Sequence, residues 1–222
     1  MKLGCVQPGY LPWIPFFKRI QQSDIFVYLD DVEFSKNNFH NRNKIRTTNG
    51  EALLTVPVFH KGHSHDFISE IKINNEQNWK NKHWKTIEYS YNKAPFFKDL
   101  HHPLKQIYNK DWHNLSDLNI SLIEIFKSYF NLKIETYKSS DFKINYDGND
   151  KLVELCKILK CNKFIVKPNT EHYHPISFFK KHKISFEFFE YNIFEYDQIH
   201  SDFIEGLSIL DLAMNCGPEA LK

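Results

Sequence analysis

Two short apolar runs near the start of the chain, separated by a turn and a helix-like segment, constrain the fold most. Lys2–Val6 and residues 25–29 have the length and composition of buried strands. Between them, a proline-rich turn leads into residues 13–21, where apolar side chains recur at helical spacing. A strand, a helix and a strand in so short a stretch form a βαβ unit, and its crossover implies a parallel sheet.

The rest of the chain alternates between strand-like and helix-like segments, without an internal repeat. Residues 79–92, 95–109 and 115–130 carry consecutive helical patterns. We therefore predict a single α/β domain over residues 1–222, with a layered parallel sheet of the Rossmann-like or HUP-like kind and a helical insert at about 79–130. The other predicted strands are residues 52–58, 68–73, 133–137, 163–166 and 184–191, and the other predicted helices are residues 149–160, 174–182 and 208–215.

Charge and composition exclude several classes of protein. The formal net charge of +2 leaves no broad basic footprint for nucleic acid. No apolar run approaches the roughly twenty residues of a membrane-spanning helix, and no signal peptide is visible, so we expect a cytoplasmic protein without a membrane span. The 4 cysteines form no CxxC pair and are too few for a disulfide scaffold, so we expect them to be reduced.

Arginine is scarce in this lysine-rich chain. Of the 29 basic residues, the only arginines are Arg19, Arg42 and Arg46. A guanidinium group offers a planar fork of donors that an ammonium group cannot copy. Each arginine therefore points either to a bidentate contact with a phosphate or carboxylate group or to a structural salt bridge.

The end of the first strand is the best candidate for a ligand site, because ligands bind at the carboxyl edge of open parallel sheets. The turn after this strand carries Gln7, Tyr10 and Trp13. Asp30 and Asp31 follow the second strand, which we expect beside the first. The sequence therefore predicts an acidic pair next to an aromatic turn.

Residues 34–46 are too polar for a core element and are predicted to form a loop. They are dense in amide and cationic donors, among them Lys36, Asn41, Arg42 and Arg46. Together with the acidic pair, these donors suit a phosphorylated or polyhydroxylated ligand. The alternative is an asparagine-rich loop that is merely solvated.

Two histidine-rich segments are candidates for a metal site. His60, His63 and His65 lie in one short loop, and His172 and His174 follow a predicted strand. No cysteine or second histidine cluster is paired with the first loop, so we predict that it is polar surface and that the chain has no metal site. No motif identifies a cofactor.

The residues of the first turn and the acidic pair also carry a family resemblance. In order and spacing, the chain resembles the WbqC-like family. The matching segments are residues 7–13, 16–17, 23–24, 29–31, 41–43, 54–58, 83–84, 91–97, 208–211 and 215–217. The chain departs from the family pattern at Pro15, where glycine is more usual, and at residues 167–173, where a Ser-Gly turn is usual.

The resemblance implies a bacterial protein linked to the synthesis of O-antigen, lipopolysaccharide or a related surface glycan. A fold-level analogy to the nucleotidylyltransferase and pantothenate-synthetase superfamily also exists. Members of that superfamily bind nucleotide phosphates through an HxGH motif in the first turn. Because Tyr10 and Trp13 stand in that stretch and HxGH is absent, we do not expect classical adenylylation.

The leading functional hypothesis is an enzyme that transfers an acyl or aminoacyl group to the amine of a nucleotide-linked sugar. In this scheme Asp30 or Asp31 is the general base, because amide formation must remove an ammonium proton. Arg42 and Arg46 hold the diphosphate, while Tyr10 and Trp13 stack on the ligand.

Two other hypotheses remain open. One is a non-catalytic module that binds sugar nucleotides or takes part in glycan assembly. The other is nucleotidyl transfer, for which Asp30 and Asp31 would supply a magnesium site. In every case the expected partner is a small nucleotide sugar and not a nucleic acid, and an oligomer is compatible with the sequence.

Overall fold

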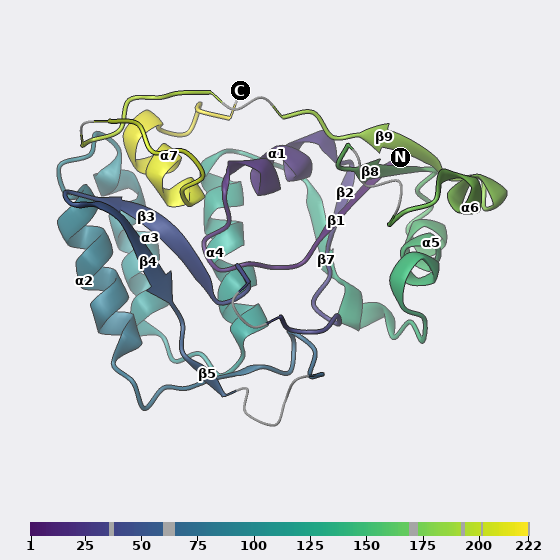
Figure 1. Ribbon diagram of the computed structural model, residues 1–222, viewed down its shortest axis with the longest axis horizontal. Coiled ribbons are helices and arrows are strands. Elements are labelled where there is room, and N and C mark those ends of the chain that lie inside the picture. The colour runs from purple at the N-terminus through teal and green to yellow at the C-terminus, as the bar shows by residue number, and fades with distance from the viewer. Residues whose placement is uncertain (36–37, 60–64, 169–172, 192–193, 201, 222) are drawn as a thin grey trace. The chain divides into compact units, whose positions relative to one another are not determined.

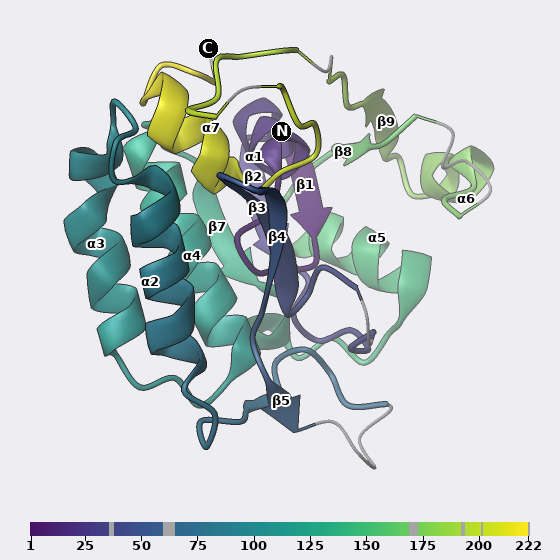
Figure 2. The same cartoon turned by 60° about the vertical axis from the view of Figure 1, so that its left-hand side comes forward.

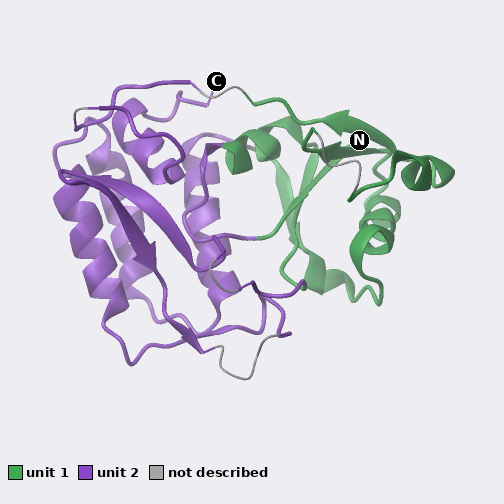
Figure 3. Cartoon of the chain, viewed as in Figure 1, with its two compact units in different colours: residues 1–7, 15–31, 133–193 green, residues 8–14, 32–132, 194–222 purple. Residues whose placement is uncertain are grey.

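A computed structural model describes residues 1–35, 38–59, 65–168, 173–191, 194–200 and 202–221. The chain divides into two compact units (Figure 3). Unit 1 consists of residues 1–7, 15–31 and 133–193, and unit 2 consists of residues 8–14, 32–132 and 194–222. Each unit is described by itself, and the expectation of a single domain stays a prediction.

Unit 1 is built on a five-stranded sheet, ordered β7-β2-β1-β8-β9, in which every pair of neighbours is parallel (Figure 1). Numbered by their order along the chain, these strands lie 3-2-1-4-5, which is the order of doubly wound, Rossmann-like sheets. The predicted fold class is therefore confirmed. The strands are β1 (Lys2–Val6), β2 (Ile25–Tyr28), β7 (Glu135–Lys138), β8 (Lys163–Val166) and β9 (Ser185–Phe188).

Helices pack on this sheet because successive side chains of a strand point to opposite faces. On one face, helix α1 (Ile14–Gln22) sets Phe16 edge-on against Phe26 of β2. The other face carries the main core cluster, in which Cys5 and Val27 pack with residues of α5 (Gly148–Ile158) and α6 (Ile176–Lys181). A short 3-10 helix, η1 (Ser139–Phe142), follows β7.

Unit 2 combines hairpins with helices. Strands β3 (Arg42–Thr47) and β4 (Gly50–Thr55) form one antiparallel pair, and β5 (Val58–Phe59) and β6 (Lys72–Ile73) form another. Figure 2 shows three of its helices side by side, in the range predicted for the helical insert. They are α2 (Trp79–Tyr91), α3 (Phe97–Asn109) and α4 (Leu115–Tyr129). The last helix is α7 (Ile209–Cys216), whose first turn is capped by Ser208 Oγ, which accepts a hydrogen bond from the Leu210 amide.

Two predictions about unit 2 were wrong. Residues 34–46 were predicted as a loop, yet Arg42–Thr47 form β3 and pair with β4 in continuous register from Arg42↔Thr55 to Thr47↔Gly50. The polarity of this strand misled the prediction, because its buried asparagine and arginine side chains find polar partners inside the unit. Residues 68–73 were predicted as one strand, but only Lys72–Ile73 is a strand, and the preceding Ile68 and Ile71 are buried outside it.

Candidate functional site

The acidic pair lies at the carboxyl end of β2, where a dense set of hydrogen bonds surrounds it. Asp30 is 1% exposed, and both of its carboxylate oxygens are engaged. Oδ1 accepts a hydrogen bond from the Ser140 amide at 3.0 Å, and Oδ2 accepts one from the Ser140 hydroxyl at 2.9 Å. The Asp30 amide in turn donates to Ser139 Oγ at 3.2 Å. Asp30 therefore fixes the start of η1 beside the end of β2.

Asp31 has a different set of contacts. One of its carboxylate oxygens accepts a hydrogen bond from the Ser139 hydroxyl, and the other lies 3.0 Å from Lys151 Nζ. Lys151 Nζ also donates to the Asp31 carbonyl oxygen at 3.1 Å, and the lysine side chain is 6% exposed. The Asp31 side chain keeps 14% exposure. Of the two predicted carboxylates, Asp31 is the one with access to solvent, and it forms an ion pair with a buried lysine of α5.

The predicted aromatic turn divides into one buried and two exposed residues. Tyr10 is 0% exposed, and its hydroxyl is hydrogen-bonded to His83 Nδ1 at 2.8 Å and to the Tyr108 hydroxyl at 2.6 Å. The Trp13 side chain is 47% exposed. Gln7, which directly follows β1, is exposed as well. Trp13 and Gln7 therefore present side chains to solvent, whereas the ring of Tyr10 belongs to the core of unit 2.

Amide side chains from distant segments hold the conformation of this turn. Leu11 has a φ of 45°, which is uncommon for a residue other than glycine. Its carbonyl oxygen accepts a 2.6 Å hydrogen bond from Asn43 Nδ2 on β3. Asn119 Nδ2 of α4 donates to the carbonyl oxygens of Pro8 at 3.0 Å and His40 at 2.8 Å. Part of the family resemblance is thus a backbone turn fixed by asparagines.

Of the four donors predicted as ligand contacts in residues 34–46, the three that the structure describes lie on β3 or directly before it, in different environments. Asn41 is 6% exposed, and its Nδ2 donates to the Val56 carbonyl oxygen at 2.8 Å. Arg42 is half-buried at the start of the strand. Arg46 is 5% exposed, so its guanidinium group is largely withdrawn from solvent. Lys36 lies outside the described residues.

A buried carboxylate that the sequence did not mark as functional lies in the same unit. Asp211 of α7 is 0% exposed and accepts hydrogen bonds from the hydroxyls of Tyr91 and Tyr196, each at 2.8 Å. Burial raises the pKa of Asp211, and the positive charge of Arg46 opposes that shift. The Tyr91 hydroxyl also accepts a hydrogen bond from the Arg46 amide at 2.9 Å. Asp211 lies among apolar residues of α7, so the sequence pattern alone did not identify it as a site residue.

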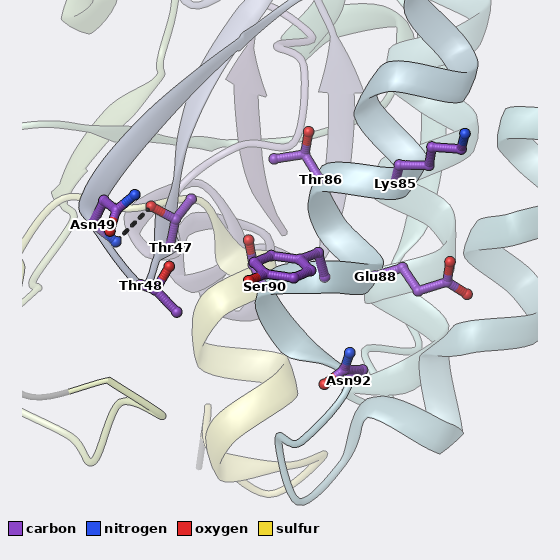
Figure 4. A pocket seen from close by; sticks show the side chains of 9 residues that line it. Thr47, Thr48, Asn49, Lys85, Thr86, Glu88, Ser90 and Asn92 are labelled. Atoms are coloured by element: carbon purple, nitrogen blue, oxygen red, sulfur yellow. Dashed lines mark hydrogen bonds between the residues drawn. The ribbon is translucent and has the colours of Figure 1, made fainter.

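An open hollow of about 770 Å³ lies on the surface of unit 2 (Figure 4). Hydroxyl and amide groups dominate its lining, with one lysine and one glutamate, and no predicted site residue lines it. Ser90 Oγ is buried there without a hydrogen-bond partner among the described residues. The lining residues are Thr47, Thr48, Asn49, Lys85, Thr86, Glu88, Tyr89, Ser90 and Asn92.

Neither a metal-ligand set nor a membrane span is found in the part of the chain that the structure describes. Within it, no three His, Cys, Asp or Glu side chains converge as a group that could hold a metal ion. His60 and His63 lie outside the described residues, so the predicted absence of a metal site there stays a prediction. No described helix is both long enough and apolar enough to cross a bilayer.

Comparison with known proteins gives a family but no substrate. The model of the WbqC-like protein family matches residues 7–222. The uncharacterized protein Rv1507c of Mycobacterium tuberculosis is 32% identical over 221 residues, which cover 99% of this chain and 95% of that protein. No solved structure matches the chain. The family match includes the turn, the acidic pair and α7, and we conclude that the chain belongs to the WbqC-like protein family.

Proposed function

We propose that this protein is a transferase of surface-polysaccharide synthesis, which attaches an acyl or aminoacyl group to the amine of a nucleotide-linked sugar. The family resemblance supports the link to surface glycans. The observation that carries the chemical part is the polar cluster at the carboxyl ends of β2 and β7, where Asp31 combines a lysine partner with access to solvent. Ligands of doubly wound sheets bind at this edge.

In this proposal Asp31 is the general base and Asp30 is a positioning residue. The sugar amine attacks the acyl carbonyl carbon, the new C–N bond forms, and the bond to the leaving group of the donor breaks. A base must take the proton that the nitrogen loses. Asp30 is a poor candidate, because it is only 1% exposed. Asp31 keeps partial exposure, and Lys151 restricts its orientation.

The proposed ligand contacts are those predicted residues whose side chains are exposed or half-buried. Trp13 offers an exposed ring on which a base or sugar can stack, and Gln7 offers an exposed amide. Arg42, half-buried at the start of β3, remains the predicted phosphate contact of this strand. Tyr10 and Arg46 leave the proposed contact set, because both are buried in polar networks of unit 2.

The contacts of Asp31 favour acyl transfer over nucleotidyl transfer. Nucleotidyl transfer would need a divalent cation at the acidic pair. In the structure, the Lys151 ammonium group already supplies a positive charge 3.0 Å from Asp31 Oδ2. A cation at that position would have to displace or repel this ammonium group.

The test is product mass spectrometry across a panel of amino-sugar nucleotides and acyl or aminoacyl donors. Asp31→Asn is expected to fold normally, bind ligand and lose roughly two to four powers of ten in kcat, as is typical for a general base. Asp147→Asn is the matched control, because Asp147 also lies near Lys151, at 4.0 Å, but its side chain is 95% exposed. Full activity of Asp31→Asn on the true substrate would rule out this base, and a panel that yields no product would favour a non-catalytic binding module.

A further inference from the structure

The sheet of unit 1 opens between β1 and β8, at the point where the strand order reverses. The ladder between these strands consists of Lys2↔Lys163 and Leu3↔Phe164. Each strand continues further with its other neighbour, β1 to Val6↔Tyr28 and β8 to Val166↔Phe188. The carboxyl halves of β1 and β8 are therefore not paired with each other. In doubly wound sheets, this reversal point is the place where a ligand binds.

Arg19 of α1 reaches into this opening. The Val6 carbonyl oxygen bonds the Leu29 amide on the β2 side, and successive carbonyl groups of a strand point to opposite sides. The Cys5 carbonyl group is therefore directed toward β8. Its oxygen accepts a 3.3 Å hydrogen bond from an Arg19 guanidinium nitrogen. The guanidinium carbon also lies 5.4 Å from the centre of the Phe189 ring, just beyond β9.

Arg19, which is half-buried, differs from the buried cations Lys151 and Arg46. Lys151 has Asp31 at 3.0 Å, and Arg46 lies in the field of the Asp211 carboxylate. Arg19 has a carbonyl oxygen and an aromatic ring but no carboxylate among the described residues. Burial lowers its pKa, and the nearby Cys5 thiol opposes that shift. A guanidinium group has five N–H donors in a fork that fits a phosphate.

His174 lies near the same opening. Its Nδ1 is hydrogen-bonded to Asn149 Oδ1 at 2.7 Å, and its ring is edge-on to Phe164 of β8 at 5.9 Å between centroids. Burial and the nearby positive charge of Arg19 both lower the pKa of His174. Because Nδ1 of His174 bonds Asn149, the other ring nitrogen, Nε2, points away from Asn149. His174 is therefore a second polar group within electrostatic range of Arg19.

We infer that the opening between β1 and β8 binds a phosphate group of the ligand, with the Arg19 guanidinium as its charged contact and His174 beside it. The inference rests on the proposed function in taking the phosphate to belong to a nucleotide-linked substrate. It adds a diphosphate contact on α1 to the contact that the sequence predicted on β3. Among the described residues, Cys5 is the hydrogen-bond acceptor of the guanidinium group, which leaves further N–H groups for the ligand.

The scarcity of arginine makes a direct test possible. Only Arg19, Arg42 and Arg46 contribute arginine Nε–Hε signals to a nitrogen-15 correlation spectrum. We would titrate the ¹⁵N-labelled protein with inorganic pyrophosphate, with the common nucleoside diphosphates and, separately, with acetate and glycine. The Arg19 signal, assigned with Arg19→Lys, is expected to shift with the phosphate compounds, together with the His174 ring signals. A shift produced only by the carboxylates, or a shift confined to Arg42 or Arg46, would overturn the inference.

Calorimetric affinities complete the test. Arg19→Met and Arg19→Lys are expected to weaken binding of the best diphosphate at least tenfold, while Lys157→Gln, which removes an exposed charge from α5, leaves it unchanged. Unaltered affinity in Arg19→Met, or binding of no diphosphate to the wild type, would refute the site. Failure of the proposed function alone would look different: the Arg19 NMR signal would still shift with the phosphate compounds, but the transfer assay would yield no product. Product formation by Arg19→Met with an unchanged KM would instead refute the inference alone.

Discussion

Arg46 of unit 2 is buried and Arg19 of unit 1 is half-buried, and their surroundings differ. Arg46 lies in a network in which the Asp211 carboxylate accepts hydrogen bonds from Tyr91 and Tyr196. Arg19 contacts a carbonyl oxygen and a ring, without an acidic partner among the described residues. A network that neutralises its own charges stabilises a fold. A partly buried cation without such a partner is stabilised most when an anionic ligand binds to it.

The strongest test of this comparison removes the carboxylate of unit 2. Asp211→Ala is expected to lower the free energy of unfolding by about 3–5 kcal/mol, because it leaves a buried guanidinium group uncompensated. Arg19→Met is expected to leave that free energy unchanged or to raise it, since no ion pair is broken. Urea denaturation measures both, with Glu205→Ala as an exposed acidic control in unit 2. If Asp211→Ala and Arg19→Met lower the free energy of unfolding equally, the two arginines do not differ in their contribution to stability.

Acid provides a second test, which concerns two histidines of unit 2. Burial lowers the pKa of His40 and of His83 from 6.5 to about 4. Between these values the unfolded chain binds protons that the folded chain does not, so stability falls as the pH drops from 6.5 to 4. The fall is on the order of 3 kcal/mol for each histidine.

Tryptophan fluorescence follows this acid effect selectively, because Trp13, Trp79, Trp84 and Trp112 all belong to unit 2. His83→Asn is expected to flatten the dependence of the urea midpoint on pH. His65→Asn is the control, because the His65 side chain is 85% exposed. An unchanged slope in His83→Asn would show that the buried histidine does not couple to folding.

Arg42 tests the sequence-based assignment of the phosphate contact to β3. Arg42→Lys keeps the charge but loses the fork, so it is expected to weaken binding of a phosphate-bearing ligand by roughly 1.5–3 kcal/mol, with little change in melting temperature. Calorimetry and thermal melting separate the two effects. Thermal destabilisation with unaltered affinity would make Arg42 a structural residue like Arg46.

The smallest effect is expected at the histidine loop. Replacement of His60, His63 and His65 together by asparagine should leave activity and melting temperature near those of the wild type. Metal analysis of the purified protein is the check. Stoichiometric zinc or iron that is lost in the triple variant would establish a metal site after all.

The sequence was most informative where the signal is local. The apolar runs predicted β1 and β8 with the observed bounds, and helical spacing predicted α2 and α4 to within one residue. β3 was missed because its inward residues are polar, as with Asn43, which is buried through its bond to Leu11. A pattern based on hydrophobicity cannot distinguish such a strand from a loop.

The candidate site was harder to predict, because its contacts join distant parts of the chain. The first turn and the acidic pair could be located from the strand ends, but their partners could not. Ser139 lies 109 positions from Asp30, and Lys151 lies 120 positions from Asp31. Tyr10 was predicted to stack on a ligand. In the structure its hydroxyl is hydrogen-bonded to His83 and Tyr108, which lie 73 and 98 positions away.

The position of β1 in the sheet has a consequence for synthesis. β1 and β2 leave the ribosome early, whereas the strands that flank them, β7 and β8, begin at residues 135 and 163. At typical translation rates of roughly 5–20 residues per second, this delay is on the order of ten seconds. During that time the apolar edges of the first two strands lack their final neighbours. We therefore expect the nascent chain to need protection by a ribosome-associated chaperone until β8 emerges, and to aggregate when translation stalls before that point.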